Sequence, residues 1–277
     1  MIVVTGATGN VGKPLVQALA AAGEQVTALS RSVPAAAGAF PAGVRHRPAD
    51  LTDPASLATA FEGAQALFLL VTGDWMATSG GPGAILGAAR SAGIRRIVHL
   101  SSQGVATHRH PPALEDAIKR SGLEWTMLRP GGFSSNTFRW AADIRERRAV
   151  VAPFGDVALP VVDPADIAEV AALTLLEAGH EGRSYVLTGP EPVTPRQQTA
   201  AIGEALGEEV RFVEQSRAEA RAQMLRFMPE QVVESTLDIL GTPLPEEQRP
   251  AADAEKLLGR PARTFATWAR RNAAAFA

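Results

Sequence analysis

The chain of 277 residues contains no cysteine, which excludes disulfides, iron–sulfur clusters and zinc sites built on thiolates. Lysine is nearly absent, with only Lys13, Lys119 and Lys256. The net charge of −2 gives no reason to expect binding to nucleic acid or to an anionic membrane. The longest apolar runs, such as ALFLLV, are too short to span a bilayer, and a strand pattern that starts at Ile2 predicts no signal peptide. We therefore expect a cytoplasmic protein without metal, either a monomer or a homodimer.

Strand-like and helix-like segments alternate through the N-terminal half. Apolar, β-branched runs predict strands within 1–6, 25–32, 66–73, 95–104 and 124–133, with a short strand after residue 45. Helical patterns cover 13–23, 53–63, 81–93 and 112–122, and Asp53 is the expected N-cap of the second of these helices. This alternation is typical of βαβ units. It predicts an α/β fold with a Rossmann-like, doubly wound parallel sheet.

The periodicity weakens after Phe133. The pattern then predicts an amphipathic helix in 136–148, two short strands in 149–162, a helix in 163–179 and a strand in 184–189. Helices and proline-rich connections follow from residue 191. We assign 1–150 to the Rossmann domain, whose last helix and strand return at 163–188. Residues 151–277 are expected to form mainly a smaller, partly helical cap that binds the substrate and is partly interleaved with the first domain.

The segment VVTGATGNVGKPLVQAL, residues 3–19, places Gly6, Gly9 and Gly12 at equal three-residue spacing between a strand and a helix. Such a loop lets the chain turn tightly, lets the backbone approach a phosphate and lets the helix pack closely. The pyrophosphate of a dinucleotide then lies at the helix N-terminus. The spacing alone would also suit an ordinary strand–turn–helix. Its position inside a βαβ unit makes nucleotide binding the favoured interpretation.

The end of the second predicted strand distinguishes NADP from NAD. An NAD site typically carries an acidic residue there for the ribose 2′-hydroxyl. This chain has Ser30 and Arg31 instead, so nothing acidic repels a 2′-phosphate, and an arginine is available to bind one. Arg31 could also be an ordinary surface cation. We favour NADPH as the cofactor.

Six segments resemble one family, the NmrA-like or atypical short-chain dehydrogenase/reductases, which include NAD(P)H:quinone oxidoreductases. They are VTGATGNVG, ADLTDPASL, VHLSSQG, SGLEWTMLRPGGF, VDPADIAEVAA and YVLTGPEPVT, in the order of the family. The resemblance implies that Asp50 and Leu51 flank the adenine, that Leu70, Val71 and Thr72 line the cofactor, and that Pro130 and Gly131 approach the nicotinamide. With the loop and the strand ends, the predicted cofactor residues are Gly6, Thr8, Gly9, Asn10, Val11, Gly12, Arg31, Asp50, Leu51, Leu70, Val71, Thr72, Ser101 and Pro130.

Ordinary members of that family use a Tyr-x-x-x-Lys pair, in which the tyrosine donates a proton to the carbonyl. Alignment on SGLEW puts these positions near Thr107 and Pro111, and the only tyrosine of the chain is Tyr185. Glu115 and Lys119 have i, i+4 spacing, which favours a helix-surface ion pair. No catalytic residue is therefore assigned. The sequence disfavours a standard alcohol dehydrogenase or sugar epimerase.

Two functions remain. The first is hydride transfer to a quinone or similar conjugated small molecule, which needs little more than positioning of the acceptor. The second is a non-catalytic sensor that binds NADP(H) and regulates a partner. For the enzyme, Ser102 or Gln103 could bind an acceptor oxygen. The predicted substrate residues are Trp75, Ser102, Gln103, Phe133 and Asn136, with Phe138 and Trp140 as further candidates. His108 and His110 could be metal ligands but are interpreted as a polar loop, and His99 is interpreted as a core or edge histidine with a hydrogen-bond partner.

Overall fold

The computed structural model describes residues 1–31, 40–71, 75 and 81–277, and its internal contacts divide the chain into two compact units. Unit one comprises residues 1–130 and 164–186, and unit two comprises residues 131–163 and 187–277. The chain therefore leaves unit one after Pro130 and returns to it for one helix and most of one strand. The boundary that we placed at residue 150 falls within unit two.

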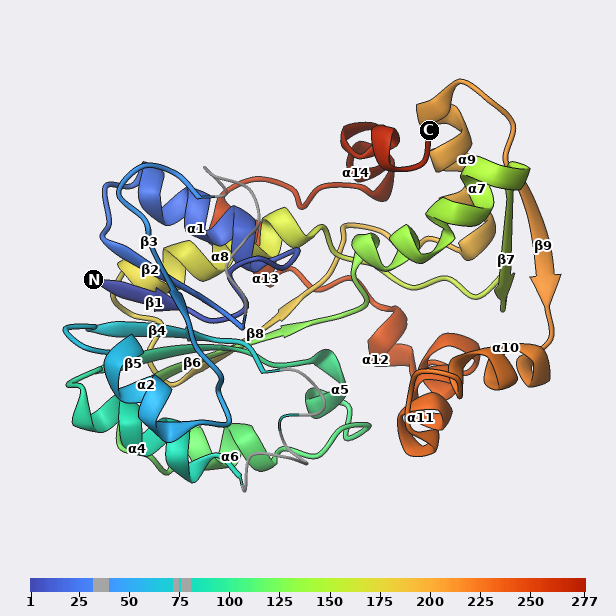
Figure 1. Cartoon of the computed structure of the whole chain (residues 1–277). Helices are drawn as coiled ribbons and strands as arrows, with labels where there is room; N and C mark the ends of the chain where they lie inside the picture. The colour runs from blue at the N-terminus through green and yellow to red at the C-terminus, as the bar shows by residue number, and fades with distance from the viewer. Residues whose placement is uncertain (32–39, 72–74, 76–80) are drawn as a thin grey trace. The chain divides into compact units, whose positions relative to one another are not determined.

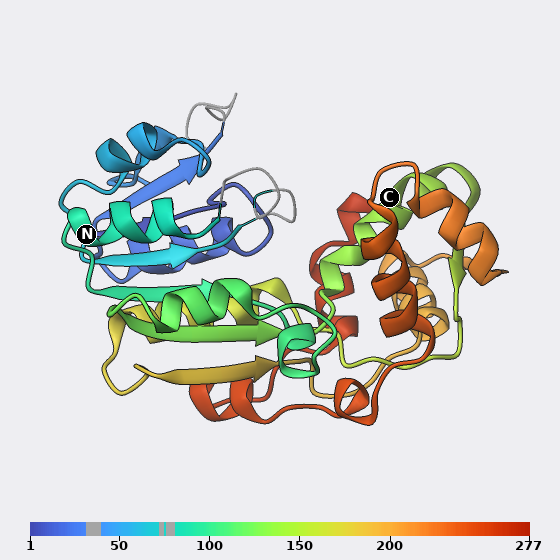
Figure 2. The ribbon, with the colours of Figure 1, turned by 90° about the horizontal axis from the view of Figure 1, so that it is seen from below.

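Unit one is built on a seven-stranded sheet. Its strands are β1 (Ile2–Val4), β2 (Val26–Ser30), β3 (Arg45–Pro48), β4 (Ala66–Leu69), β5 (Arg96–Leu100), β6 (Glu124–Pro130) and β8 (Arg183–Leu187). Their order is β3-β2-β1-β4-β5-β6-β8. The green arrow of β6 and the yellow arrow of β8 point the same way in Figure 2. Because β1 pairs in parallel with both β2 and β4, the strand order reverses at β1, where doubly wound sheets bind their ligands. The predicted fold class is confirmed.

Helices cover both faces of this sheet. They include α1 (Gly12–Ala21), α2 (Pro54–Ala60), α4 (Gly83–Ser91), α5 (Gln103–Ala106), α6 (Ala113–Lys119) and α8 (Pro164–Leu176). Helices α1 and α8 lie side by side on one face, and α2, α4 and α6 lie on the other (Figure 1). Asp53 caps α2 as predicted, since its Oδ1 accepts a hydrogen bond from the N–H of Ala55 at 3.0 Å. His99 is buried, and its Nδ1 lies 2.9 Å from the carbonyl oxygen of Leu69, which confirms a core histidine with a partner.

Unit two combines helices with a two-stranded parallel sheet. Its core includes Trp140, Ile144, Val150, Phe265 and Trp268. The elements are η1 (Ser134–Trp140), a 3₁₀ helix, α7 (Ala141–Arg147), β7 (Ala149–Pro153), α9 (Pro195–Leu206), β9 (Arg211–Gln215), α10 (Arg217–Met224), α11 (Glu230–Gly241), α12 (Pro245–Gln248), α13 (Asp253–Leu258), α14 (Phe265–Arg271) and η2 (Ala273–Ala275), also 3₁₀.

Two expectations about unit two are wrong. Only the first of the two strands predicted in 149–162 forms, because Pro153 ends β7 and Pro160 has no N–H for a ladder. Leu159 makes only an isolated bridge with Val193. Strand β9 was missed because its charged, largely exposed sequence RFVEQ lacks an apolar run, and only its pairing with β7 identifies it. Within the part of the chain that the structure describes, no helix has both the length and the apolar character needed to cross a bilayer.

Candidate cofactor and active site

A cavity of ≈ 510 Å³ opens at the carboxyl ends of β1 to β4, next to the switch point of unit one, which is the place at β1 where the strand order reverses. It is bounded by the loop after β1, by the ends of β2 and β3, and by Leu70 after β4. Seven predicted cofactor residues line it. These seven are Gly6, Thr8, Gly9, Arg31, Asp50, Leu51 and Leu70. The other lining residues are Thr5, Leu29, Ser30, Ala49, Thr52 and Trp75. The cavity lies where a doubly wound fold binds a dinucleotide.

The three glycines of the loop meet three different requirements. Gly6 has φ +63°, and a Cβ there would stand 2.5 Å from Cδ2 of Leu70. Gly12 lies so close to the carbonyl oxygen of Gly6 that no side chain fits. Among the described residues, a Cβ on Gly9 would meet only that same oxygen, at 3.3 Å, so the backbone would have to give by a few tenths of an ångström to admit a side chain. Of the three glycines, Gly9 is therefore the one whose replacement disturbs the protein itself least.

The N-terminus of α1 is suited to an anion. No side chain caps it at Val11, and its first turn contains no acidic residue. The first N–H groups of a helix have no partners within the helix, and its dipole favours negative charge. Thr8, Gly9 and Asn10 form the exposed tip of the loop directly before it. The loop and the helix start together fit the pyrophosphate of a dinucleotide.

At the end of β2, Ser30 and Arg31 line the cavity in the place where an NAD site carries an acid. The Oγ of Ser30 lies 2.8 Å from Nε2 of His46, which extends from β3, and the His46 ring stacks on Phe40. Asp50, which follows the neighbouring strand β3 and also lines the cavity, accepts hydrogen bonds from the N–H and Oγ1 of Thr52. These bonds hold the pKa of Asp50 below its usual value, and the charge of Arg31 adds to this effect.

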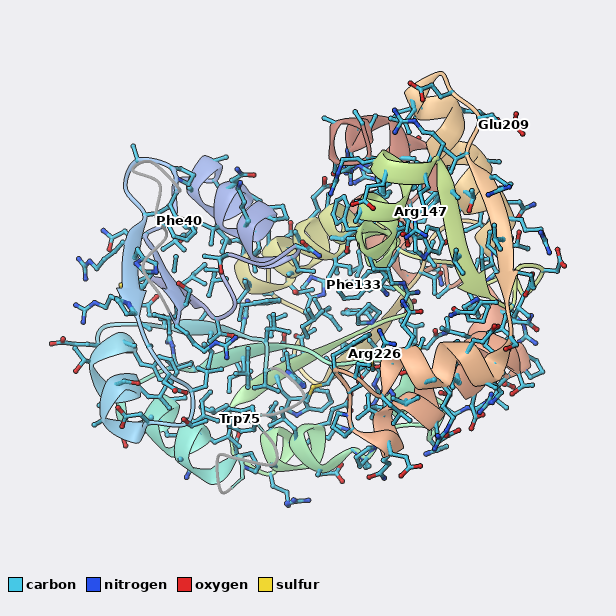
Figure 3. The ribbon with its side chains drawn as sticks, turned by 45° about the vertical axis from the view of Figure 1, so that its right-hand side comes forward. Phe40, Trp75, Phe133, Arg147, Glu209 and Arg226 are labelled. Carbon is cyan, nitrogen blue, oxygen red and sulfur yellow. The ribbon has the colours of Figure 1, made fainter. Side chains whose placement is uncertain are left out.

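Trp75, labelled in Figure 3, belongs to this cavity. Its side chain is 4% exposed, and its Nε1–H donates to the carbonyl oxygen of Leu51 at 3.0 Å. The structure therefore places this predicted substrate residue beside Leu51 in unit one. Phe133 and Asn136 belong to unit two, at the start of η1. Phe138 packs on Trp268 and Phe276, and Trp140 is buried in the same core.

Other predicted cofactor residues lie outside the lining of the cavity. Val11 and Gly12 are buried where α1 begins, Val71 packs against the core after β4, and Pro130 is the buried last residue of β6. Thr72 lies outside the described residues.

The expected helix-surface ion pair between Glu115 and Lys119 is wrong, because the Glu115 carboxylate is buried near the ends of β5 and β6. Glu115 does pair with Lys119, at 3.2 Å, but the Glu115 side chain is only 1% exposed, so this is not a surface ion pair. It also accepts from Ser101 Oγ at 2.7 Å and from Nε and Nη2 of Arg129 at 2.9 and 2.5 Å. Burial by itself would raise the pKa of Glu115, but these hydrogen bonds outweigh it and lower the pKa to about 2. Spacing along α6 alone could not reveal Arg129, which comes from β6.

A Rossmann-type sheet with a glycine loop and a cavity at its switch point defines a dinucleotide-binding protein. Residues 6–177 match the NAD(P)H-binding family, and the chain belongs to this family, as an NmrA-like NAD(P)H-dependent reductase. A (4-alkanoyl-5-oxo-2,5-dihydrofuran-3-yl)methyl phosphate reductase of Streptomyces griseus is 39% identical, with 100% of this chain and 99% of that protein covered.

Two solved structures are also similar. The NADPH-dependent quinone oxidoreductase of Escherichia coli, in complex with NADPH, has a TM-score of 0.80 and 29% identity over 98% of this chain and 99% of that one. NmrA, a negative transcriptional regulator, has a TM-score of 0.71 and 25% identity over 97% of this chain and 94% of that one.

Proposed function

We propose that this protein is an NADPH-dependent reductase that transfers hydride to a small conjugated acceptor, such as a quinone, without a Tyr-x-x-x-Lys pair. The observation that carries the proposal is the position of the only tyrosine. Tyr185 lies in β8, and its hydroxyl is 2.9 Å from Nδ1 of His180, in the turn before that strand. It is thus oriented toward the amino end of a parallel strand, whereas the cavity lies at the carboxyl ends.

The chemistry of the similar proteins supports a conjugated acceptor. A quinone that takes up hydride becomes a phenolate-like anion. The furanone in the name of the Streptomyces griseus reductase has a ring double bond conjugated to two carbonyl groups, so hydride addition leaves a delocalised enolate. Both anions are stabilised without an acid. A reductase for either class can therefore rely on positioning the acceptor.

In the bound complex, NADPH would supply the hydride, and the chain would supply its binding and orientation. Gly9 and the start of α1 would hold the pyrophosphate, and Ser30 and Arg31 would hold the 2′-phosphate. Asp50 and Leu51 would flank the adenine.

NADPH should bind about 10- to 100-fold more tightly than NADH, because Arg31 makes a charge-assisted contact with a phosphate that NADH lacks. Arg31→Asp should abolish or reverse this preference. Calorimetric titration with both cofactors measures it. Arg45→Asp, at the amino end of β3, makes the same change of net charge away from the cavity and should keep the preference. Equal affinities of the unmodified protein for both cofactors would contradict the assignment.

We expect NADPH oxidation with benzoquinone or naphthoquinone and little with simple ketones or secondary alcohols. An alkoxide needs a positioned acid, worth roughly 10²–10⁴ in rate, whereas a hydroquinone anion needs it far less. Tyr185→Phe should change turnover less than about twofold, because this tyrosine bonds His180. Steady-state assays over a panel of acceptors test both points. Strong ketone reduction that collapses in Tyr185→Phe would refute the proposal.

The similarity to NmrA supports a second candidate, an NADP(H) sensor without turnover. The same assays separate the two functions. Tight NADPH binding with no oxidation by any acceptor would favour the sensor.

A further inference from the structure

Ser102 and His110 form a hydrogen-bonded pair just beyond β5. The Oγ of Ser102 lies 3.1 Å from Nδ1 of His110 and accepts from the N–H of Gly104 at 3.0 Å. Both side chains are half-buried, so they are accessible from solvent. Part of this geometry is the ordinary N-cap of α5. The N-cap itself does not need the histidine.

The loop 107–110 is folded so that the His110 ring lies on Ser102. The N–H groups of Arg109 and His110 both donate to the carbonyl oxygen of Gly104, at 2.8 and 2.9 Å, and His108 turns the chain with φ +60°. A Cβ on Gly104 would stand 2.5 Å from Nδ1 of His110, so only glycine leaves room for the ring. Two backbone bonds, an unusual backbone conformation and one glycine thus hold the imidazole in place.

This pair lies beyond the carboxyl end of its strand, on the same side of the sheet as the cavity at the carboxyl ends of β1 to β4. Strand β5 pairs in parallel with β4, and Leu70, just beyond β4, lines the cavity. The adenine and phosphates of a dinucleotide occupy the β2 side of the switch point, so its reactive end extends toward β4 and β5. We propose that Ser102 and His110 act together as the proton donor to the oxygen of the reduced acceptor. This inference rests on the proposed function, since it requires an acceptor.

The hydrogen-bonding capacity of the Ser102 hydroxyl determines which protonation state of His110 is active. Its oxygen has two lone pairs and one O–H. When Nδ1 of His110 carries a proton, both lone pairs accept, from His110 and from Gly104, and the O–H is left to donate to the acceptor. When Nδ1 lacks a proton, Ser102 donates to His110 instead. The dyad therefore acts as an acid only while His110 is the doubly protonated imidazolium, because a neutral ring that gave up its Nδ1 proton would be left as an imidazolate.

The balance of the step is simple. Hydride from NADPH brings two electrons and one hydrogen to the acceptor and leaves a negative charge on its oxygen. A new O–H bond forms there as the O–H bond of Ser102 breaks, and the Nδ1 proton of His110 restores the hydroxyl. Solvent then reprotonates the half-buried imidazole.

The experiment is single-turnover oxidation of NADPH by naphthoquinone, measured between pH 5 and 9, where histidines ordinarily titrate. Among the described residues, the titratable and charged groups near Ser102 and His110 along the chain are His108 and Arg109 on the same loop and Glu115 of α6, which bonds Ser101, while α5 carries no charge. In the unmodified protein we expect the rate to fall about tenfold as the pH rises, as for a modest general acid. NMR titration of His110 should give the same midpoint.

Three single variants and one double variant test the dyad. His110→Gln, Ser102→Ala and Gly104→Ala should each have the low rate at every pH, with NADPH affinity unchanged, and the double variant of Ser102 and His110 should lose no more than either single variant. Gly104→Ala removes neither group and acts only by displacing the ring. His108→Asn is the control, since asparagine tolerates positive φ, and it should keep the pH profile.

The outcomes are distinguishable. A wild-type profile in His110→Gln, or a kinetic midpoint that differs from that of the His110 imidazole, overturns the dyad and leaves the reductase proposal intact. No turnover of any acceptor by the unmodified protein overturns both.

Discussion

Gly9→Val should abolish measurable NADPH binding, with a loss of affinity of at least about 100-fold, while the protein stays folded. The valine side chain would occupy the space beside the helix start where the pyrophosphate must approach the backbone. The fold should accommodate it, because among the described residues a Cβ there meets only the Gly6 carbonyl oxygen, at 3.3 Å, which would have to move by a few tenths of an ångström. Calorimetry with NADPH measures the first effect, and thermal unfolding without cofactor measures the second.

Two other glycines make the test specific. Gly12→Val should unfold or grossly destabilise unit one, because its side chain would collide with the backbone of Gly6. Gly87→Val, in α4, is the matched control, since a Cβ there has no neighbour within 4 Å among the described residues outside its own helix. Normal NADPH binding by Gly9→Val would show that the phosphates lie elsewhere.

Glu115→Gln should lower the free energy of unfolding by about 3 kcal/mol, at the lower end for breaking a buried ion pair. The substitution keeps the volume of the side chain but removes the charge that compensates Arg129, whose side chain is only 19% exposed. Urea unfolding without cofactor measures the change. The control is Glu124→Gln, which breaks a pair with Arg96 but is 51% exposed, so it should cost less than about 1 kcal/mol. Equal effects of the two variants would show that burial of Glu115 adds nothing.

The acid dependence of stability should change in the same variant. The hydrogen bonds to Glu115 lower its pKa in the folded protein to about 2, from an ordinary value of 4.5, so folding favours the charged form. Its contribution is therefore complete above about pH 5 and is lost progressively as the pH falls toward 2. Glu115→Gln lacks this contribution, and its free energy of unfolding should fall less steeply over that range.

The sequence by itself determined the fold class and the glycine loop between β1 and α1. Both are encoded locally, in the alternation of strand and helix patterns and in the spacing of Gly6, Gly9 and Gly12. Ser30 and Arg31 could be found in the same way, because the end of the second strand lies at a known distance from the loop.

Only the tertiary structure decided which side chains meet across strands and loops. Arg129 of β6 reaches Glu115 because α6 packs against β6, and the indole N–H of Trp75 reaches the carbonyl oxygen of Leu51. Strand β9 is identified only by its pairing with β7. Ser102 and His110 meet because the intervening loop returns to Gly104. Such contacts depend on sheet register and on the path of a loop, and these are set by packing of the whole unit rather than by any local pattern of residues.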